Sequence, residues 1–152
     1  LEHRIGGLEK DDAGNISYDA ENHERMTHLR AAKVAKIADD IPPLEVDDPT
    51  GDATLLVLGW GSTYGVITAG VRRARGAGKN VASAHLTHLN PLPANTGEVL
   101  RRYARVLIPE MNLGQLAKIV RAEFLVDAES FTKVQGQPIF ASEMEREILR
   151  RL

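Results

Sequence analysis

The 152-residue sequence contains no cysteine. A chain without thiols cannot form a disulfide, ligate an iron–sulfur cluster, build a cysteine-ligated zinc site or use a thiol nucleophile. Any redox chemistry connected with this chain must therefore depend on groups supplied from elsewhere. Aromatic residues are also scarce, at 5% of the chain, and are not interleaved with the basic groups at 72–75, 101–102 and 146–151. With a formal net charge of −2, these groups are interpreted as solvated helix faces, and no nucleic-acid partner is expected.

Long apolar runs are absent as well. No stretch approaches the roughly 20 apolar residues that span a bilayer, and the acidic start lacks the basic and apolar parts of a signal peptide. We therefore expect no membrane partner and a cytoplasmic location. Because the sequence begins at Leu1 rather than at a methionine, we also expect a fragment or a processed piece of a longer protein.

The composition that remains is that of an ordinary folded protein, with 43% hydrophobic and 26% charged residues. The charge is divided unevenly, because residues 1–50 carry 6 basic and 12 acidic side chains, whereas residues 51–152 carry 13 and 9. Pro42, Pro43 and Pro49 lie in the segment between the two regions and favour a stiff, extended connector. The shift in charge and this connector place a domain boundary at about Gly51.

The first 50 residues predict a hairpin, a helix and that connector. Turn-forming residues at 11–14 separate two short segments, which favours a β-hairpin or an ordered loop. A helix is predicted from a cap at Asp19 or Asn22 to about Asp39. Its apolar stripe consists mainly of small side chains, at Ala31, Val34, Ala35 and Ala38. Such side chains bury little area, so this helix must rest on something else.

From residue 53 onward, predicted strands and helices alternate. Strands are predicted at 53–58, 81–89 and 104–108, with extended pieces at 124–126 and 132–134, and helices after 62 up to about 77, at 95–103, at 112–121 and from 142 onward. Asn95, Asn112 and Ser142 are the predicted helix caps, because Glu or Gln follows each at capping-box spacing. The alternation predicts an α/β fold with a mostly parallel sheet covered on both faces.

In such a sheet, ligands and partners meet the carboxyl ends of the strands, so the loops there hold the candidate functional residues. The candidates are Gly59, Gly61 and Ser62 after the first strand, Asn90 and Pro91 after the second, and Glu110, Asn112, Gly114 and Gln115 after the third. The two glycines at 59 and 61 let the backbone turn tightly, and the helix after them can receive an anion at its exposed amides. A dinucleotide fingerprint lacks its third glycine, because position 64 is Tyr. A plain strand-to-helix turn with a capping serine is the favoured interpretation.

Histidines and a glutamate near the strand ends allow chemical and structural interpretations. If residues 85–88 are extended, His85 and His88 point to opposite faces and cannot share a metal, so no metal site is expected. A lone histidine there more often donates a structural hydrogen bond than serves as an acid or base. The proline-rich exit of this loop is expected to project Leu92 outward. Glu110 is conceivable as a general base, but a carboxylate bonded to backbone or to a neighbouring subunit is favoured.

Five stretches of the sequence, taken together, have a familiar pattern. They are residues 4–9, the set Glu21, Asn22, His23, Met26, Arg30 and Lys33, and the loops 59–65, 88–93 and 109–116. In this order they resemble the C-terminal part of the α subunit of 2-oxoacid:ferredoxin oxidoreductases, with the closest likeness to the 2-oxoglutarate enzymes. The resemblance covers nearly the whole chain.

The resemblance implies that residues 51–152 form a three-layer α/β/α sandwich similar to the transketolase C-terminal domain. Residues 1–50 would be the tail of a preceding pyrimidine-binding domain and a linker. Enzymes of this family decarboxylate a 2-oxoacid on thiamine diphosphate with Mg, pass electrons through an iron–sulfur cluster to ferredoxin, and give the acyl group to coenzyme A. The family builds those sites largely from the preceding α domain and the β subunit, so no cofactor site and no catalytic residue is expected in this chain.

We therefore expect a structural and assembly domain of a thiamine diphosphate-dependent oxidoreductase, inactive by itself. The expected partners are the preceding α-subunit domains, the β subunit and, through the complex, ferredoxin and coenzyme A. Glu110, Asn112 and Gln115 are the candidates for polar contacts with those partners. The alternative is a free-standing module that binds a nucleotide or coenzyme A at the helix N-terminus after Gly61. A protein-interaction adaptor unrelated to metabolism is a third hypothesis.

Overall fold

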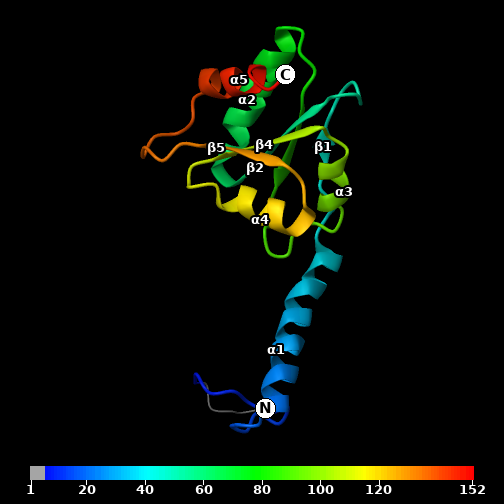
Figure 1. Cartoon of the computed structure of the whole chain (residues 1–152), viewed down its shortest axis with the longest axis vertical. Helices are drawn as coiled ribbons and strands as arrows, with labels where there is room; N and C mark the ends of the chain where they lie inside the picture. Colours follow the sequence, from blue (N-terminus) through cyan, green and yellow to red (C-terminus); the bar gives the residue numbers. More distant parts are fainter. Residues whose placement is uncertain (1–5) are drawn as a thin grey trace. The chain divides into compact units, whose positions relative to one another are not determined.

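The computed structural model of the chain describes residues 6–152, which fall into two compact units (Figure 1). The first unit ends at Ile41, and the second runs from Pro42 to Leu152. Residues 4 and 5, which open the predicted hairpin and the first stretch of the family resemblance, lie outside the described residues.

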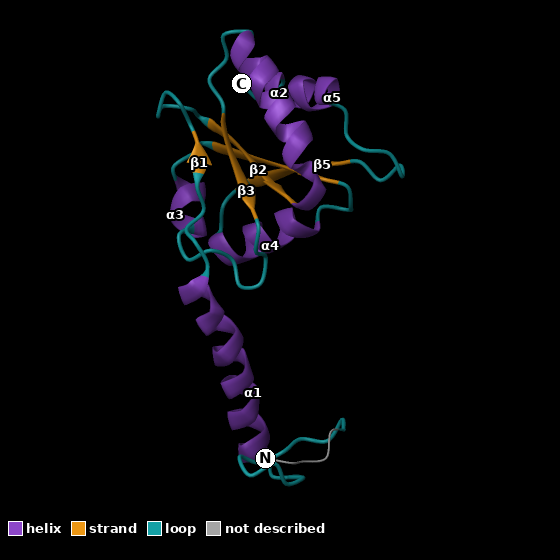
Figure 2. Ribbon diagram, turned by 180° about the vertical axis from the view of Figure 1, so that it is seen from behind, coloured by secondary structure: helices purple, strands orange, loops and turns teal. Residues whose placement is uncertain are grey.

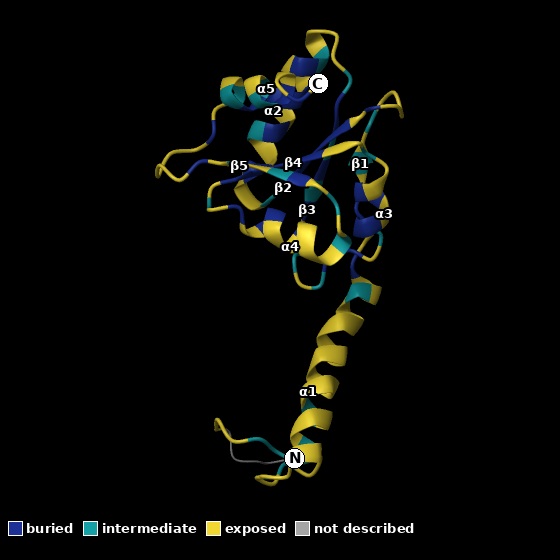
Figure 3. Ribbon diagram, viewed as in Figure 1, coloured by how far each residue is buried: buried dark blue, intermediate teal, exposed yellow. Residues whose placement is uncertain are grey.

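The first unit contains a bridged turn and one α-helix. Lys10 and Ile16 form an isolated antiparallel bridge, so the hairpin is present in reduced form. The helix α1 (Ala20–Ala35) begins at the predicted cap Asp19, whose carboxylate accepts a hydrogen bond from Asn22 N at 2.7 Å, and a 3₁₀ turn (Lys36–Asp40) continues it. No residue of α1 is buried (Figure 3). A helix of this length gains little stability without a packed face. The small-residue stripe of α1 is not buried, although the sequence predicts that it packs on another element.

The second unit is built on a five-stranded sheet (Figure 2). The strands are β1 (Val46–Asp47), β2 (Leu55–Trp60), β3 (Ala82–Leu86), β4 (Arg105–Glu110) and β5 (Ala128–Thr132). Their spatial order is β1-β3-β2-β4-β5, in which β1 is antiparallel to β3 and every other neighbouring pair is parallel. The predicted α/β fold with a mostly parallel sheet is confirmed.

Helices cover both faces of this sheet (Figures 1 and 2). The helices α2 (Tyr64–Gly76) and α5 (Ala141–Leu149) lie on one face, and α3 (Thr96–Arg101) and α4 (Gln115–Phe124) lie on the other. Side-chain alternation along β2 sends Leu55 and Val57 into the core under α2 and α5, whereas Leu56 and Leu58 enter the core under α3 and α4. Burial on both sides explains the continuous apolar run and completes the three-layer α/β/α sandwich.

The second unit begins before Gly51, because the proline-rich segment is bonded to the sheet unit. Leu44 N donates to Asn95 Oδ1 at 2.7 Å, and Asn95 Nδ2 donates to Leu44 O at 3.0 Å. Arg75 donates to the carboxylate and to the carbonyl oxygen of Asp47, each at 2.8 Å. The side chain of Asn95 therefore holds the connector and does not cap α3, which corrects the predicted capping box.

Three further local predictions are wrong. β5 occupies residues 128–132, between the two extended pieces that were expected. Helix α5 begins before Ser142, because the Glu143 carboxylate accepts from Phe140 N at 2.7 Å and fixes the start there. Leu92 is only 9% exposed and packs in the core under α3 and α4, so it anchors its loop on the core instead of projecting outward.

Candidate functional site

The turns after β2 and β4 lie at one edge of the sheet. The two strands are parallel neighbours, and the helices that follow them, α2 and α4, cover opposite faces (Figure 2). This is the switch point at which open α/β sheets commonly bind ligands. The fold brings to it the predicted residues Gly59, Gly61 and Ser62 from one turn and Glu110, Asn112, Gly114 and Gln115 from the other. Asn90 and Pro91 lie apart from them, in the loop after β3.

Gly59 lies inside β2 and makes room for side chains from two other elements. A Cβ atom at this position would approach Ile67 Cδ1 to 2.4 Å, His85 Nδ1 to 3.0 Å and Thr63 Oγ1 to 3.1 Å. Its role is therefore close packing of α2 and β3 on the strand rather than a change in backbone direction. Gly61 is the residue that turns, with φ of +56°, a conformation that favours glycine.

A hydroxyl group closes the turn after β2, but it belongs to Thr63. Thr63 Oγ1 accepts from Trp60 N at 3.1 Å and donates to Trp60 O at 2.8 Å, and the side chain is buried. Ser62 is exposed and makes no side-chain hydrogen bond within residues 6–152, so the predicted capping serine is wrong. The α2 N-terminus has no side-chain cap.

Glu110 at the end of β4 is fully buried, and both of its carboxyl oxygens bond to the start of α4. Oε2 accepts from Leu116 N at 2.9 Å, and Oε1 accepts from Ala117 N at 3.1 Å. This is the backbone-bonded carboxylate that the sequence favoured over a general base. A group enclosed in this way is not placed to contact a partner directly, contrary to its selection as an interface residue.

Asn112 completes the same closure. Its Oδ1 accepts from Gly114 N at 2.8 Å and from Gln115 N at 2.9 Å, so it closes the turn just before α4. The N-cap of α4 is Gly114, and the predicted capping box at Asn112 is wrong. Gly114 adopts φ of +78°, and a side chain there would meet Ser130 Oγ at 3.1 Å. The backbone amides of residues 114–117 thus all have side-chain acceptors from within the chain. The α4 N-terminus is therefore closed to an external anion.

The loop after β3 presents polar groups. His88 Nδ1 lies 3.0 Å from Thr87 Oγ1, and Asn90 is exposed beside the cis peptide bond to Pro91. His85, within β3, packs edge-to-face on Tyr64 with ring centroids 5.1 Å apart. Burial lowers the pKa of His85, an effect that the Gly61 backbone opposes in part. The imidazole is accordingly neutral near pH 7.

Apolar side chains remain exposed at this edge. Leu113 is 75% exposed and Tyr64 is 61% exposed, and Met111 and Val134 are also exposed. The four residues follow β2, β4 and β5 in the chain, so they lie at the carboxyl ends of three adjacent strands. We call this set the apolar edge. A cluster of this kind at a functional edge is typical of a surface that meets another protein.

Metal and cluster ligands are not found together in the part of the chain that the structure describes. Within residues 6–152 there is no group of three or more His, Asp or Glu side chains that could hold a metal ion. No helix among these residues is both long and apolar enough to cross a bilayer. The cysteine-free sequence does not fit an iron–sulfur cluster.

Sequence reasoning missed two residues that shape this region. Thr63 closes the β2 turn, and the signal available for it was a Thr three residues after Trp60, at capping spacing. Asn95 bonds to the backbone of Leu44 across 51 positions of sequence, for which the sequence contains no local signal.

Comparisons with known proteins give consistent relatives, although no family model matches the chain. The 2-oxoglutarate oxidoreductase subunit KorA of Mycobacterium tuberculosis is 58% identical over 147 residues, which is 96% of this chain and 22% of that protein. The α subunit of 2-oxoacid:ferredoxin oxidoreductase 1 of Aeropyrum pernix is 34% identical, over 94% of this chain and 24% of that protein.

A solved structure agrees with these relatives. It is the 2-oxoglutarate:ferredoxin oxidoreductase of Magnetococcus marinus with 2-oxoglutarate, coenzyme A and succinyl-CoA bound. The TM-score is 0.89 at 28% identity, and the match covers 98% of this chain and 26% of that one. The chain thus spans about a quarter of the length of these proteins. The resemblance predicted from the sequence is confirmed.

Proposed function

We propose that this chain, which is related in sequence and fold to part of the α subunit of 2-oxoacid:ferredoxin oxidoreductases, is an assembly domain of a 2-oxoglutarate:ferredoxin oxidoreductase. In this proposal the unit that begins at Pro42, and so extends the predicted residues 51–152, corresponds to a transketolase C-terminal-like domain. The residues before it correspond to the tail of a pyrimidine-binding domain and a linker. The carboxyl edge of the sheet docks on the rest of the α subunit and on the β subunit.

The apolar edge is the observation that carries this proposal. The polar side chains Glu110 and Asn112 of the turn after β4 already accept hydrogen bonds from backbone amides at the start of α4. Leu113, Met111 and Tyr64 are left exposed around them. An edge with internally satisfied polar groups and exposed apolar side chains favours protein contact over chemistry.

The cofactors of the reaction are placed on other polypeptide segments in this proposal. Thiamine diphosphate, Mg and an iron–sulfur cluster need phosphate, metal and thiolate partners that residues 6–152 do not bring together. The chain's own contribution is to position its neighbours, so no catalytic step is assigned to its side chains. Electron transfer to ferredoxin and acyl transfer to coenzyme A are functions of the whole complex.

Split-protein complementation tests this function. The chain alone, the remaining polypeptides alone and the two co-expressed are assayed for 2-oxoglutarate- and coenzyme A-dependent reduction of a viologen dye. We expect turnover only in the co-expressed sample, together with co-elution on gel filtration. Turnover by the chain alone, or full activity of the remainder without it, would refute the assembly role.

A second candidate function is a coenzyme A or nucleotide site at the α2 N-terminus. It is favoured by the bound coenzyme A of the Magnetococcus marinus enzyme, and by the absence of a side-chain hydrogen bond to the first amides of α2, whereas the Glu110 carboxylate bonds to amides of α4. Calorimetry of the chain with coenzyme A, AMP and diphosphate separates the two functions. The assembly role expects no binding tighter than millimolar, which corresponds to about −4 kcal/mol.

A further inference from the structure

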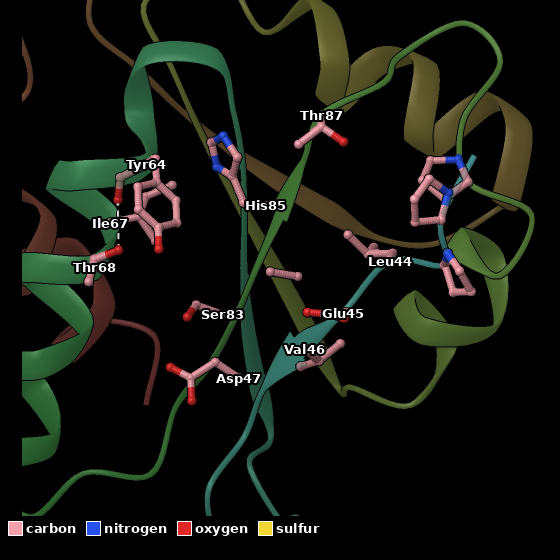
Figure 4. Close-up of a pocket in the computed structure, with 14 residues that line it drawn as sticks. Leu44, Glu45, Val46, Asp47, Tyr64, Ile67, Thr68, Ser83, His85 and Thr87 are labelled. Carbon is pink, nitrogen blue, oxygen red and sulfur yellow. Dashed lines mark hydrogen bonds between the residues drawn. The ribbon is translucent and has the colours of Figure 1, made fainter. Parts of the chain in front are cut away.

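A pocket of about 620 Å³ lies on the sheet face that α2 and α5 cover (Figure 4). It is bordered by residues 42–47, by Tyr64, Ile67 and Thr68 of α2, and by the β3 region. The two helices pack over β2 and β4, whose side chains form the core on this face, and β3 and β1 continue the sheet beyond β2. The pocket therefore lies beside α2, where the helical cover of this sheet face ends over β3 and β1.

The floor of the pocket is polar because of strand alternation. Ser83, His85 and Thr87 line it, whereas Ala82 and Leu86 of the same strand enter the opposite core. Asp47 pairs with Ser83 in the sheet and so shares its face, and Glu45, two residues earlier, also lines the pocket. Figure 4 shows these side chains gathered between α2 and β1. An occupant of this pocket therefore meets hydrogen-bonding groups on the β3 side as well as apolar walls.

The charge of the lining selects the sign of that occupant. No Lys or Arg lines the pocket, and the Asp47 carboxylate is already paired with Arg75 at 2.8 Å. Glu45 is exposed and makes no side-chain hydrogen bond or ion pair within residues 6–152. One unneutralised carboxylate among hydroxyl groups and a neutral imidazole attracts a cation and repels phosphates and carboxylates.

The shape of the lining favours a cation on an aliphatic stem. Ile67, Pro42 and Pro43 provide apolar walls beside the polar floor. Long basic side chains cover apolar surface with their methylene groups while the charged end reaches polar partners. A bare metal ion does not fit, because no three ligating side chains converge within the described chain.

We propose that this pocket receives a lysine or arginine side chain from a neighbouring polypeptide of the complex, with the Glu45 carboxylate as its ion-pair partner and Ser83 as a hydrogen-bonding group. The inference rests on the proposed assembly function and adds a specific contact over β3 and β1, next to Tyr64 of the apolar edge. It gives the partner's chemistry, namely a basic side chain in a segment that covers β3 and β1.

Charge reversal in the complete complex tests the contact. Glu45→Lys is compared with Glu123→Lys, which makes the same charge change at an exposed position of α4, and circular dichroism verifies that both fold. We expect Glu45→Lys to weaken assembly by about five- to tenfold at low salt, with a smaller effect at high salt, while Glu123→Lys assembles like the unchanged chain. Equal assembly of the two variants would overturn the inference.

Photo-cross-linking identifies the occupant. Benzoylphenylalanine incorporated at position 68, an exposed residue of the pocket wall, is irradiated in the assembled complex. We expect a cross-linked peptide from another polypeptide segment with a Lys or Arg within a few residues, whose reversal to Glu restores assembly of Glu45→Lys. A peptide without a basic residue, or no cross-linked polypeptide, would overturn the inference. The unchanged chain separates the two hypotheses. If it assembles with its partners, the assembly function stands whatever the cross-linking result; if it does not assemble, the assembly function itself is refuted.

Discussion

The turns after β2 and β4 begin with similar sequence signals and end in different structures. Both combine glycine with small polar residues, and both lead directly into a helix. After β4, Glu110 and Asn112 bond to the amides of residues 114–117 and close the helix start. After β2, Thr63 bonds back to Trp60, and α2 begins without a side-chain cap. The comparison teaches that a carboxylate at a strand end can anchor the start of the next helix, whereas the turn after β2 is closed by a hydroxyl group of its own.

At this sheet edge, the turn before α4 is held rigidly by internal hydrogen bonds, whereas the start of α2 lacks such side-chain bonds. A helix start whose amides are already bonded holds Met111 and Leu113 in place for contact, but offers nothing to a charged ligand. The start of α2 continues a 3₁₀ turn (Gly61–Thr63), has no side-chain cap, and presents the exposed ring of Tyr64. The four predictions below test whether the two turns differ as described.

The largest effect is expected from Glu110→Ala. The change leaves Leu116 N and Ala117 N without their acceptors and empties a fully buried site, so the free energy of unfolding should fall by about 3–5 kcal/mol. Denaturant unfolding of wild type and variant measures it. Glu123→Ala, on the exposed side of α4, is the control and should stay within about 0.5 kcal/mol. A loss below about 1 kcal/mol for Glu110→Ala would mean that the carboxylate is not an anchor.

Gly59→Ala tests the turn after β2. The new methyl group meets Ile67, His85 and Thr63 at 2.4–3.1 Å, so we expect a loss of about 1–3 kcal/mol from overpacking. Adding Ile67→Val should restore part of the loss, because the nearest atom, Ile67 Cδ1, is then removed.

Gly65→Ala is the matched control for this substitution. Nothing lies within 4 Å of a Cβ atom at position 65, and alanine is the better helix former, so stability should rise by up to about 1 kcal/mol. Similar effects of the two substitutions would show that close approach at Gly59 is unimportant.

Asn112→Ala should lower the free energy of unfolding by less than Glu110→Ala or Gly59→Ala does. Loss of the two bonds to Gly114 N and Gln115 N resembles loss of a helix cap, which costs about 1 kcal/mol. Hydrogen exchange should become faster at residues 114 and 115 and stay unchanged at 116 and 117, which Glu110 still holds. Faster exchange at all four amides would show that the two side chains act as a single unit.

The sheet and its layers could be predicted because their signals are local. The continuous burial of residues 55–59 in β2 follows from its apolar run. The apolar stripes of α2 and α4 follow from the helical spacing of apolar residues within each helix. The family resemblance was equally accessible, since it depends on short motifs in order. Asp19 was found as a cap because a cap acts on amides two or three residues away.

The remaining features depend on contacts that sequence spacing does not encode. Asn95 was assigned to a helix cap, but a distant backbone segment at Leu44 competes for its amide. Gly59 looked like a turn residue because its need for space comes from α2 and β3. Leu92 looked exposed because its burial depends on how the loop folds over the core. In each case tertiary packing decided between local alternatives.

A change of pH should affect stability through His85, which packs next to the turn after β2. This effect should be the smallest of the four that are predicted. Burial lowers the pKa of His85, so below about pH 6.5 the unfolded chain binds this proton more readily than the folded chain. The free energy of unfolding should therefore fall as the pH decreases through that range. Wild type should lose more stability than His85→Gln between about pH 7.5 and about pH 5.5, and the imidazole NMR signals of His85 should titrate below the ordinary histidine range. Equal losses of stability in wild type and His85→Gln would contradict this prediction. They would show that the His85 ring, which packs on Tyr64 beside Gly59, is solvated in the folded chain.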